Sequence, residues 1–191
     1  TNGNIPVVYA GSSSVHGNVY SNPYSFSKWQ GEELCKLYSE IYDLPTTICR
    51  FYNVYGPHQL VDGPYCTVIG IFQKQYEEGK PLTITWDGEQ RRDFTHVDDI
   101  VDGLLCVLEK NPNAVPYNVA TGKGTTITEL VKTITDIYGY EPKFNYDITK
   151  PTMIHKRLLN VSKIKEDLGW SAKYDLRAGL EKTIDWYKRN K

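Results

Sequence analysis

Four tyrosines in this chain lie four residues before a lysine, a spacing that can support redox chemistry. The pairs are Tyr24/Lys28, Tyr76/Lys80, Tyr146/Lys150 and Tyr187/Lys191. On a helix, residues i and i+4 are neighbours, so the ammonium of the lysine can stabilise the phenolate of the tyrosine. Such a tyrosine can take a proton from an alcohol while hydride leaves the same carbon. The pattern also arises without any function, so the flanking sequence has to distinguish between the pairs.

The flanking residues favour Tyr24 and Lys28. Gly79 interrupts the second pair, the third straddles a predicted strand end before Pro151, and the fourth lies at the terminus, where order is least expected. Only Tyr24 and Lys28 begin a predicted helix directly after a strand that ends in serines. In open α/β sheets, ligands bind at that end of the strands. The local pattern alone supports a catalytic pair and an ordinary helix start with a solvated lysine equally well.

Strands and helices alternate along the chain, which favours an α/β fold with mostly parallel strands. We predict strands over IPVVYA before the serines, TTICRFYNVYG (46–56), PLTIT, VPYNVATG and KFNYDI. We predict helices over 24–42, about 66–78, 96–110, 126–138, about 162–168 and about 176–189. Asp98 is the predicted cap of the third helix, and Thr126 and Glu129 have capping-box spacing at the start of the fourth. Gly139 and Gly169 are predicted helix ends.

Composition and charge narrow the class of protein. The chain has 191 residues, of which 40% are hydrophobic and 24% charged, as in ordinary globular proteins. A net charge of −1 gives no general attraction to nucleic acid or to an anionic membrane. No apolar run approaches the roughly 20 residues that a membrane span needs. We therefore expect neither nucleic acid nor membrane as a partner.

The four cysteines are predicted to be free, buried thiols. Cys35, Cys49, Cys66 and Cys106 are scattered, form no C-x-x-C motif and have no histidine at metal-ligand spacing. We therefore expect no metal site and no disulfide, and the predicted compartment is the reducing cytoplasm.

Six segments, in order, carry a family resemblance: VVYAGSSSVHG, PYSFSK, RFYNVYGP, PLTITWDGEQRRDFTHVDDIVDGL, YNVATGKGTTITELV and KPTMIHKRLLNVSKIKEDLGW. Together they resemble the extended short-chain dehydrogenase/reductases, in particular the NAD-dependent nucleotide-sugar epimerases and dehydratases related to UDP-glucose 4-epimerase. The resemblance covers nearly the whole chain. The chain has no G-x-G-x-x-G, the motif that holds a dinucleotide pyrophosphate.

The resemblance therefore implies the C-terminal portion of such an enzyme, with the end of a Rossmann-like parallel sheet and a small α/β substrate-binding domain. Residues 1–57 would be the remainder of the NAD-binding domain, formed by a strand, the Tyr-Lys helix and a second strand. Residues 58–191 would be mainly the substrate-binding domain, with some segments returning to the Rossmann domain.

The resemblance also assigns roles in catalysis and cofactor binding. Tyr24 and Lys28 match the catalytic pair, and Ser12 matches the catalytic serine or threonine. These three residues would also contact the cofactor, NAD, because the lysine of the family holds the nicotinamide ribose. Tyr52 matches a residue beside the nicotinamide.

The implied substrate is a nucleotide-diphosphate sugar. The implied substrate-binding residues are Ser13, Asn53, Thr67, Val68, Thr83, Thr85, Arg92 and Lys150. The Asn53 amide can donate to a phosphate oxygen without adding charge, and the Arg92 guanidinium has the planar fork that suits a diphosphate. Thr67, Val68 and the strand from Thr83 to Thr85 match segments that line the nucleotide pocket.

The implied reaction is a 4-epimerisation: oxidation at sugar C4, rotation of the keto sugar, and reduction from the other face. Ser13 and Ser14 stand where 4,6-dehydratases carry aspartate and glutamate, and hydroxyls lack comparable basicity. His16 replaces a common tyrosine. The alternatives are another keto-sugar enzyme (a GDP-sugar epimerase/reductase, a dehydratase or a decarboxylase) or an inactive nucleotide-sugar-binding or assembly fragment.

Members of the family commonly dimerise through the Tyr-Lys helix, so the resemblance implies a homodimer. Trp29, Leu37 and Tyr38 would either lie in that interface or pack against the missing part of the sheet.

Overall fold

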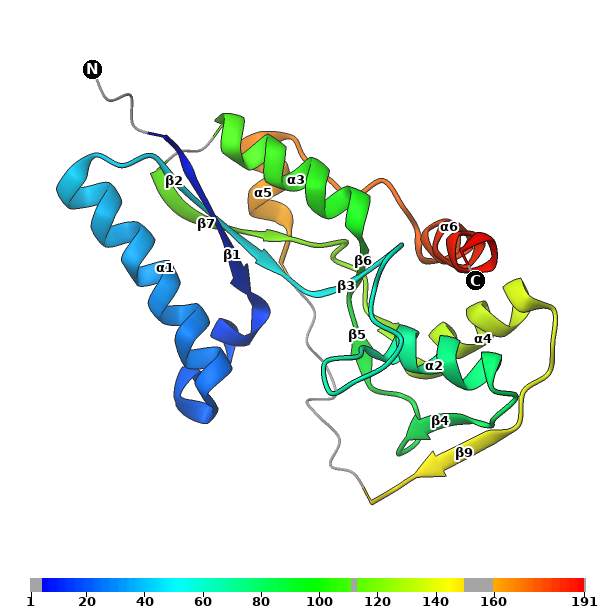
Figure 1. The fold of residues 1–191 in the computed structure, drawn as a ribbon. Helices are drawn as coiled ribbons and strands as arrows, with labels where there is room; N and C mark the ends of the chain where they lie inside the picture. The colour runs from blue at the N-terminus through cyan, green and yellow to red at the C-terminus, as the bar shows by residue number, and fades with distance from the viewer. Residues whose placement is uncertain (1–4, 111–112, 150–159, 191) are drawn as a thin grey trace. The chain divides into compact units, whose positions relative to one another are not determined.

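The computed structural model describes residues 5–110, 113–149 and 160–190 (Figure 1). In chain order its elements are β1 (Val7–Ser12), the 3₁₀ turns η1 (Ser13–His16) and η2 (Val19–Ser21), α1 (Pro23–Tyr42), β2 (Thr46–Phe51), β3 (Asn53–Tyr55), α2 (Val68–Glu77), β4 (Leu82–Thr85), β5 (Arg91–Arg92), β6 (Phe94–His96), α3 (Val97–Lys110), β7 (Asn113–Val119), β8 (Thr125–Thr126), α4 (Ile127–Tyr138), β9 (Phe144–Asp147), α5 (Ser162–Leu168) and α6 (Leu176–Arg189). The predicted α/β class with mostly parallel strands is confirmed.

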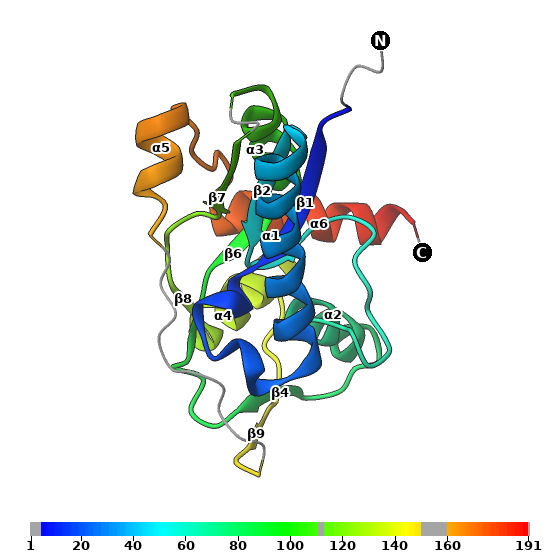
Figure 2. The same cartoon turned by 90° about the vertical axis from the view of Figure 1, so that its left-hand side faces the viewer.

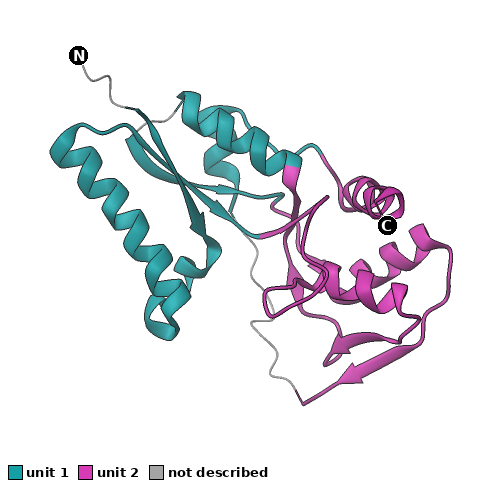
Figure 3. Cartoon of the chain, viewed as in Figure 1, with its two compact units in different colours: residues 1–52, 98–121, 159–173 teal, residues 53–97, 122–158, 174–191 magenta. Residues whose placement is uncertain are grey.

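The chain forms two compact units and crosses between them several times (Figure 3). Unit 1 comprises residues 1–52, 98–121 and 159–173. Unit 2 comprises residues 53–97, 122–158 and 174–191.

Unit 1 is built on a three-stranded parallel sheet in the order β1-β2-β7. Helix α1 covers one face of this sheet, and α3 and α5 lie on the other face (Figures 1 and 2). Ser12 pairs in register with Phe51, which pairs with Val119. The carboxyl ends of the three strands therefore meet at one edge, where ligands bind in sheets of this kind.

Unit 2 has an apolar core between short two-stranded sheets and helices α2, α4 and α6. Its sheets are β3-β6 and β4-β9, which are parallel, and β5-β8, which is antiparallel. The buried core residues are Tyr55, Ile69, Phe72, Leu82, Ile84, Phe94, Ile127, Leu130, Val131, Ile134, Leu180 and Ile184. Leu82 and Ile84 of β4 face this core, and the alternating residues Thr83 and Thr85 point to the opposite face.

The prediction of one strand over residues 46–56 is wrong. Tyr52 separates β2, which pairs within unit 1, from β3, which pairs with β6 in unit 2. A continuous β-branched and aromatic run does not show that its two halves join different sheets. The short strands β5, β6 and β8 are likewise absent from the predicted elements.

Most helix boundaries agree with their signals. Thr126 and Glu129 form the predicted capping box of α4, and Gly139 and Gly169 end their helices in the left-handed region with φ of 68° and 71°. One cap is wrong: α3 begins at Val97, so Asp98 lies inside the first turn, where its charge faces the positive helix end.

All four cysteines are free, and Cys35 and Cys49 are buried. Burial raises the pKa of the Cys49 thiol to about 12, with a further contribution from Cys106. Among the helices of the described residues, none is long and apolar enough to cross a membrane.

Candidate active site

Ser12 and Tyr24 meet at the carboxyl end of β1. The Tyr24 hydroxyl donates to Ser12 Oγ at 3.3 Å, and the Ser14 backbone N–H donates to the same oxygen at 3.2 Å. Ser12 is buried, whereas Tyr24 is 57% exposed. The serine is therefore held by the fold, while the phenol stays accessible to a ligand.

The start of α1 places Tyr24 and Lys28 on one helix face. The Asn22 side chain accepts from the Ser25 backbone N–H at 2.9 Å, and Pro23 occupies the first helical turn. An N-cap asparagine followed by proline is a strong helix start, because the proline lacks the N–H that would be unpaired there. This start puts Lys28 one turn after Tyr24.

Lys28 is held by β1 as well as by its own helix. Its Nζ donates to the Ala10 carbonyl at 2.9 Å and lies 5.9 Å from the Tyr24 ring centroid and 5.6 Å from that of Tyr9. An ammonium has three hydrogens, so the bond to Ala10 leaves two that can point to a ligand.

Tyr9 brings β1 and α1 close together beside Lys28. Its hydroxyl donates to the Lys28 carbonyl at 3.3 Å, and a Cβ at position 31 would overlap that hydroxyl, so a larger residue than Gly31 would displace the Tyr9 ring. Burial raises the pKa of the Tyr9 phenol, and Cys35, Glu32 and Tyr24 add to the shift. Tyr9 therefore stays neutral and remains a donor.

An ion pair with a fully buried carboxylate fixes α1 to β2. Glu32 is 1% exposed, and its carboxylate accepts from Arg50 Nε at 3.0 and 3.1 Å and also from Nη2. Arg50 pairs in register with Gly11, the residue before Ser12. The pair thus joins the helix that carries Tyr24 to the strands that carry Ser12.

The other predicted residues of unit 1 lie near the same sheet edge. Ser13 begins η1 directly after Ser12. Tyr52 follows β2, is buried beside Ala120 and Val161, and its ring stacks with that of His16 at 6.4 Å.

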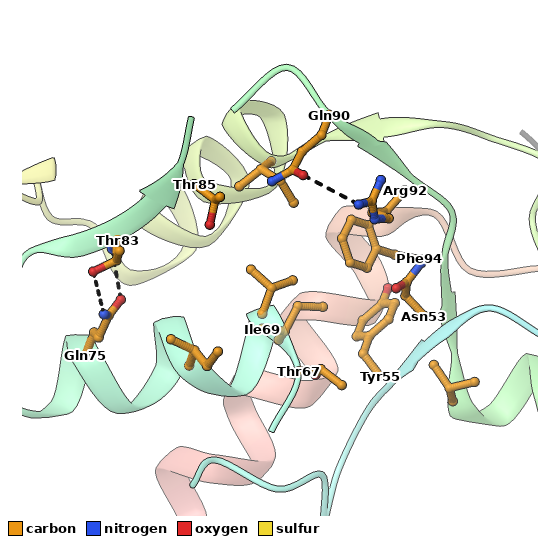
Figure 4. Close-up of a pocket in the computed structure, with 14 residues that line it drawn as sticks. Asn53, Tyr55, Thr67, Ile69, Gln75, Thr83, Thr85, Gln90, Arg92 and Phe94 are labelled. Carbon is orange, nitrogen blue, oxygen red and sulfur yellow. Dashed lines mark hydrogen bonds between the residues drawn. The ribbon is translucent and has the colours of Figure 1, made fainter. Parts of the chain in front are cut away.

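Unit 2 contains a cavity of about 410 Å³ that brings together most of the predicted substrate-binding residues (Figure 4). Six of them line it: Asn53, Thr67, Val68, Thr83, Thr85 and Arg92. They come from β3, the start of α2, β4 and β5. Lys150 lies outside the described residues.

Polar side chains in this cavity are oriented by their neighbours. Arg92 donates through Nη1 to the Arg91 carbonyl at 2.8 Å and through Nη2 to Gln90 Oε1 at 3.5 Å. The Asn53 amide donates to the Asp93 carbonyl at 3.1 Å. Figure 4 shows the Gln90–Arg92 contact at one side of the cavity and the paired bonds between Gln75 and Thr83 at the other.

Several contributing residues are missing from the prediction. Gln75 and Gln90 line the cavity, and Glu32, Arg50 and Tyr9 support the Ser12 end of β1. Glu32 follows Lys28 by four residues on α1, which is a usable signal. The partners Arg50 and Tyr9 depend on strand register, and a single sequence does not give that register.

The arrangement in unit 1 can remove a proton from an alcohol. In such a reaction the Tyr24 side chain would act as the base, the Lys28 ammonium would add a nearby positive charge, and the Ser12 hydroxyl would be a partner for the same proton. Among the residues that the structure describes, no three histidine, cysteine, aspartate or glutamate side chains form a group that could hold a metal.

Comparisons with known proteins give a matching family model and several similar proteins. The model of the "NAD dependent epimerase/dehydratase family" matches residues 3–120. The chain is 34% identical over 169 residues to a putative UDP-glucose 4-epimerase of Methanocaldococcus jannaschii, covering 88% of this chain and 54% of that protein. It is 30% identical over 178 residues to GDP-L-fucose synthase 1 of Arabidopsis thaliana, covering 87% and 53%.

A solved structure shares the fold. The UDP-glucuronic acid 4-epimerase of Bacillus cereus, in complex with UDP-glucuronic acid and NAD, matches with a TM-score of 0.82 and 30% identity, covering 97% of this chain and 62% of that chain. The chain thus spans about half the length of the curated relatives it matches.

Proposed function

The chain belongs to the NAD-dependent epimerase/dehydratase family, and from this premise we propose that the protein carrying it is a nucleotide-sugar 4-epimerase. The observation that supports this best is the Ser12–Tyr24–Lys28 arrangement, with Tyr24 Oη 3.3 Å from Ser12 Oγ and Lys28 one helical turn away. In the proposed reaction, Tyr24 takes the proton of the sugar C4 hydroxyl and later returns it, Ser12 shares that proton, and the Lys28 ammonium provides a positive charge nearby.

The residues of unit 1 fit the nicotinamide-ribose part of NAD. Lys28 has hydrogens available for ribose hydroxyls, and the exposed Tyr24 phenol lies beside it. Ser12, Tyr24, Lys28 and Tyr52 would contact this part of the cofactor. The chemistry that NAD supplies when bound is reversible acceptance of hydride from a sugar carbon.

The cavity of unit 2 suits the nucleoside diphosphate of the substrate. Its volume of about 410 Å³ lies in the range of small-molecule sites. Arg92 supplies a planar fork for the diphosphate, and Asn53 supplies an amide. Thr67, Val68, Thr83 and Thr85 would border the nucleoside, Ser13 would contact the sugar, and Lys150 remains a proposed phosphate contact.

Epimerisation is preferred to dehydration because of the residues that follow Ser12. The turn Ser13–His16 carries no carboxylate that could remove a proton from a second sugar carbon. A GDP-sugar epimerase/reductase is the second candidate, since one relative is a GDP-L-fucose synthase. A homodimer through α1 also remains a proposal; Leu37 and Tyr38 are 46% and 47% exposed.

Ligand binding is tested by thermal unfolding of this chain with UDP, GDP, dTDP, the matching nucleotide sugars and NAD. A ligand at about 100 times its dissociation constant stabilises a two-state fold by roughly 2.7 kcal/mol. We expect one nucleoside diphosphate to raise the melting temperature more than the others. If none of the nucleotides does so, the proposed role of the unit 2 cavity is wrong.

The reaction is tested by product analysis with the full natural polypeptide that carries this sequence. We expect the C4 epimer of the supplied nucleotide sugar, with no net change in NADH. A product with an altered redox state favours the reductase, loss of water favours a dehydratase, and loss of carbon favours a decarboxylase.

A further inference from the structure

His16 is an exposed residue at the end of η1 that has no role in the proposed reaction. His16 follows β1, but its side chain contacts residues of the two other strand ends, Tyr52 after β2 and Asn118 in β7. Its Nε2 lies 3.1 Å from Asn118 Oδ1, although the two residues are 102 positions apart. The His16 ring also stacks with the Tyr52 ring, at an interplanar angle of 26°. The side chain therefore spans the carboxyl ends of all three strands of the unit 1 sheet.

The direction of this hydrogen bond follows from the second contact of Asn118. Asn118 Nδ2 donates to the Asn160 carbonyl at 2.9 Å, so its Oδ1 is the atom that faces His16. A carbonyl oxygen only accepts, and His16 Nε2 therefore carries the hydrogen. The bond needs a donor at that position, which neutral and protonated imidazole can both provide.

The turn between β1 and His16 orients Ser12. Ser12 Oγ accepts from the Ser14 N–H at one end of η1, and the Gly17 N–H donates to the Ser14 carbonyl at 3.1 Å at the other. One end of the turn is fixed by the sheet. The other end has the His16–Asn118 link.

We propose that His16 is a positioning residue: through its link to Asn118 it holds η1 and thereby the orientation of the Ser12 hydroxyl toward Tyr24. This inference rests on the proposed function, because it assigns His16 an effect on the residue that shares the proton. In this proposal His16 acts through η1 and not by contact with substrate or cofactor.

The direct test is amide hydrogen exchange in this chain, read by NMR. We expect His16→Leu and Asn118→Ala to speed exchange of the Ser14 and Gly17 amides several-fold. His16→Gln, whose side-chain amide can donate to Asn118, should restore much of the protection. The matched control is Tyr117→Phe, which removes another β7 side-chain bond, from the Tyr117 hydroxyl to Asp167 at 2.9 Å. The control should leave Ser14 and Gly17 unchanged.

The second test is turnover by the full natural polypeptide. We expect His16→Leu and Asn118→Ala to lower kcat several-fold with KM for the nucleotide sugar nearly unchanged, and His16→Gln to recover kcat. Should His16→Leu fail to fold, Asn118→Ala carries the same test.

The two tests separate the inference from the proposed function. Unchanged exchange at Ser14 in both variants overturns the inference, whatever the turnover. Faster exchange with wild-type kcat also overturns it, because the His16–Asn118 bond would then stabilise η1 without affecting how Ser12 acts in the reaction. A wild-type protein that turns over no nucleotide sugar contradicts the proposed function, and the proposed effect of His16 on turnover is then lost with it.

Discussion

Units 1 and 2 assemble their functional groups in different ways. In unit 1, Ser12, Tyr24 and Lys28 come from one continuous stretch, where a strand, a turn and the first turns of a helix follow each other. In unit 2, the cavity is lined by residues from Asn53 to Ile127, taken from separate strands and loops, from α2 and from the first residue of α4. Chemistry that depends on local spacing can be recognised in a sequence, whereas a cavity depends on how distant segments pack.

The two units also differ in what supports these groups. Helix α1 is held to its sheet by the buried Glu32–Arg50 pair and by Tyr9 against Gly31. The cavity of unit 2 lies against an apolar core in which Phe72 and Leu130 are fully buried. We therefore expect unit 1 to be sensitive to single polar substitutions and unit 2 to distribute its stability over many contacts.

The largest expected effect is that of Tyr24→Phe on turnover. Loss of the phenol removes the proposed acid/base group, which typically contributes about 10²–10⁴-fold in rate. The phenol makes one long hydrogen bond and is mostly exposed, so stability should change by no more than about 1 kcal/mol. Turnover of the full natural polypeptide and thermal unfolding of this chain provide the two measurements.

The matched control is Tyr42→Phe, on the same helix and 63% exposed. It should leave turnover unchanged. Wild-type turnover in Tyr24→Phe would contradict the proposal that unit 1 carries the acid/base group. The comparison of a catalytic unit 1 with a ligand-binding unit 2 would then no longer hold.

The sequence predicts features that depend on local spacing better than features that depend on how distant segments pack. The helix start at Asn22-Pro23 and the capping box at Thr126 are local signals, and both elements form where they indicate. The split of the 46–56 segment at Tyr52 is a question of which sheet each half joins, and no local pattern encodes that choice. The Glu32–Arg50 pair and the His16–Asn118 link likewise depend on register between strands.

The family resemblance, and not a local sequence pattern, predicts the cavity residues. Thr67, Thr83 and Arg92 carry no local signal that joins them, and only the family resemblance places them together. Gln75 and Gln90 line the same cavity without being predicted. Physical reasoning from one sequence therefore singles out Tyr24 and Lys28 as a candidate pair, while Ser12 and the cavity residues of unit 2 are predicted through the family resemblance.

Arg50→Met tests the polar support of unit 1. It leaves the Glu32 carboxylate buried without its partner, and removing one member of a buried pair typically costs about 3–5 kcal/mol. Denaturant unfolding measures the loss, and amide exchange should show it first in unit 1, at strand residues such as Ile48. The double variant Glu32→Leu/Arg50→Met should recover much of the stability, because no unpaired charge remains.

A surface ion pair provides the comparison for Arg50. Lys163→Met removes the exposed bridge to Asp167 in the same unit and should cost no more than about 1 kcal/mol. Equal losses for Arg50→Met and Lys163→Met would contradict a structural role for the buried pair.

Arg92→Lys should affect unit 2 binding with little effect on chemistry. Lysine keeps the charge but loses the planar fork, so the affinity for a nucleoside diphosphate should fall by about 1.5 kcal/mol, roughly tenfold. Titration calorimetry of this chain measures the affinity. Arg91→Lys is the control, because Arg91 donates to the Gly124 carbonyl and does not line the cavity. A larger loss of affinity for Arg91→Lys than for Arg92→Lys would mean that Arg91, and not Arg92, contacts the diphosphate.

The smallest expected effect is that of Thr126→Ala, which tests whether unit 2 tolerates loss of a local polar contact. The Thr126 side chain accepts from the Glu129 N–H at 2.9 Å, and the Glu129 carboxylate accepts from the Thr126 N–H at 2.8 Å. Replacing an N-cap threonine with alanine costs about 1 kcal/mol, and Thr126→Ser should retain most of that stability. Because α4 also buries Leu130, Val131 and Ile134 in the core, the helix should persist and ligand affinity should stay unchanged. Denaturant unfolding and titration with the nucleoside diphosphate check both statements. A loss as large as that of Arg50→Met would mean that unit 2 also depends on single polar contacts, and the distinction between the two units would then no longer hold.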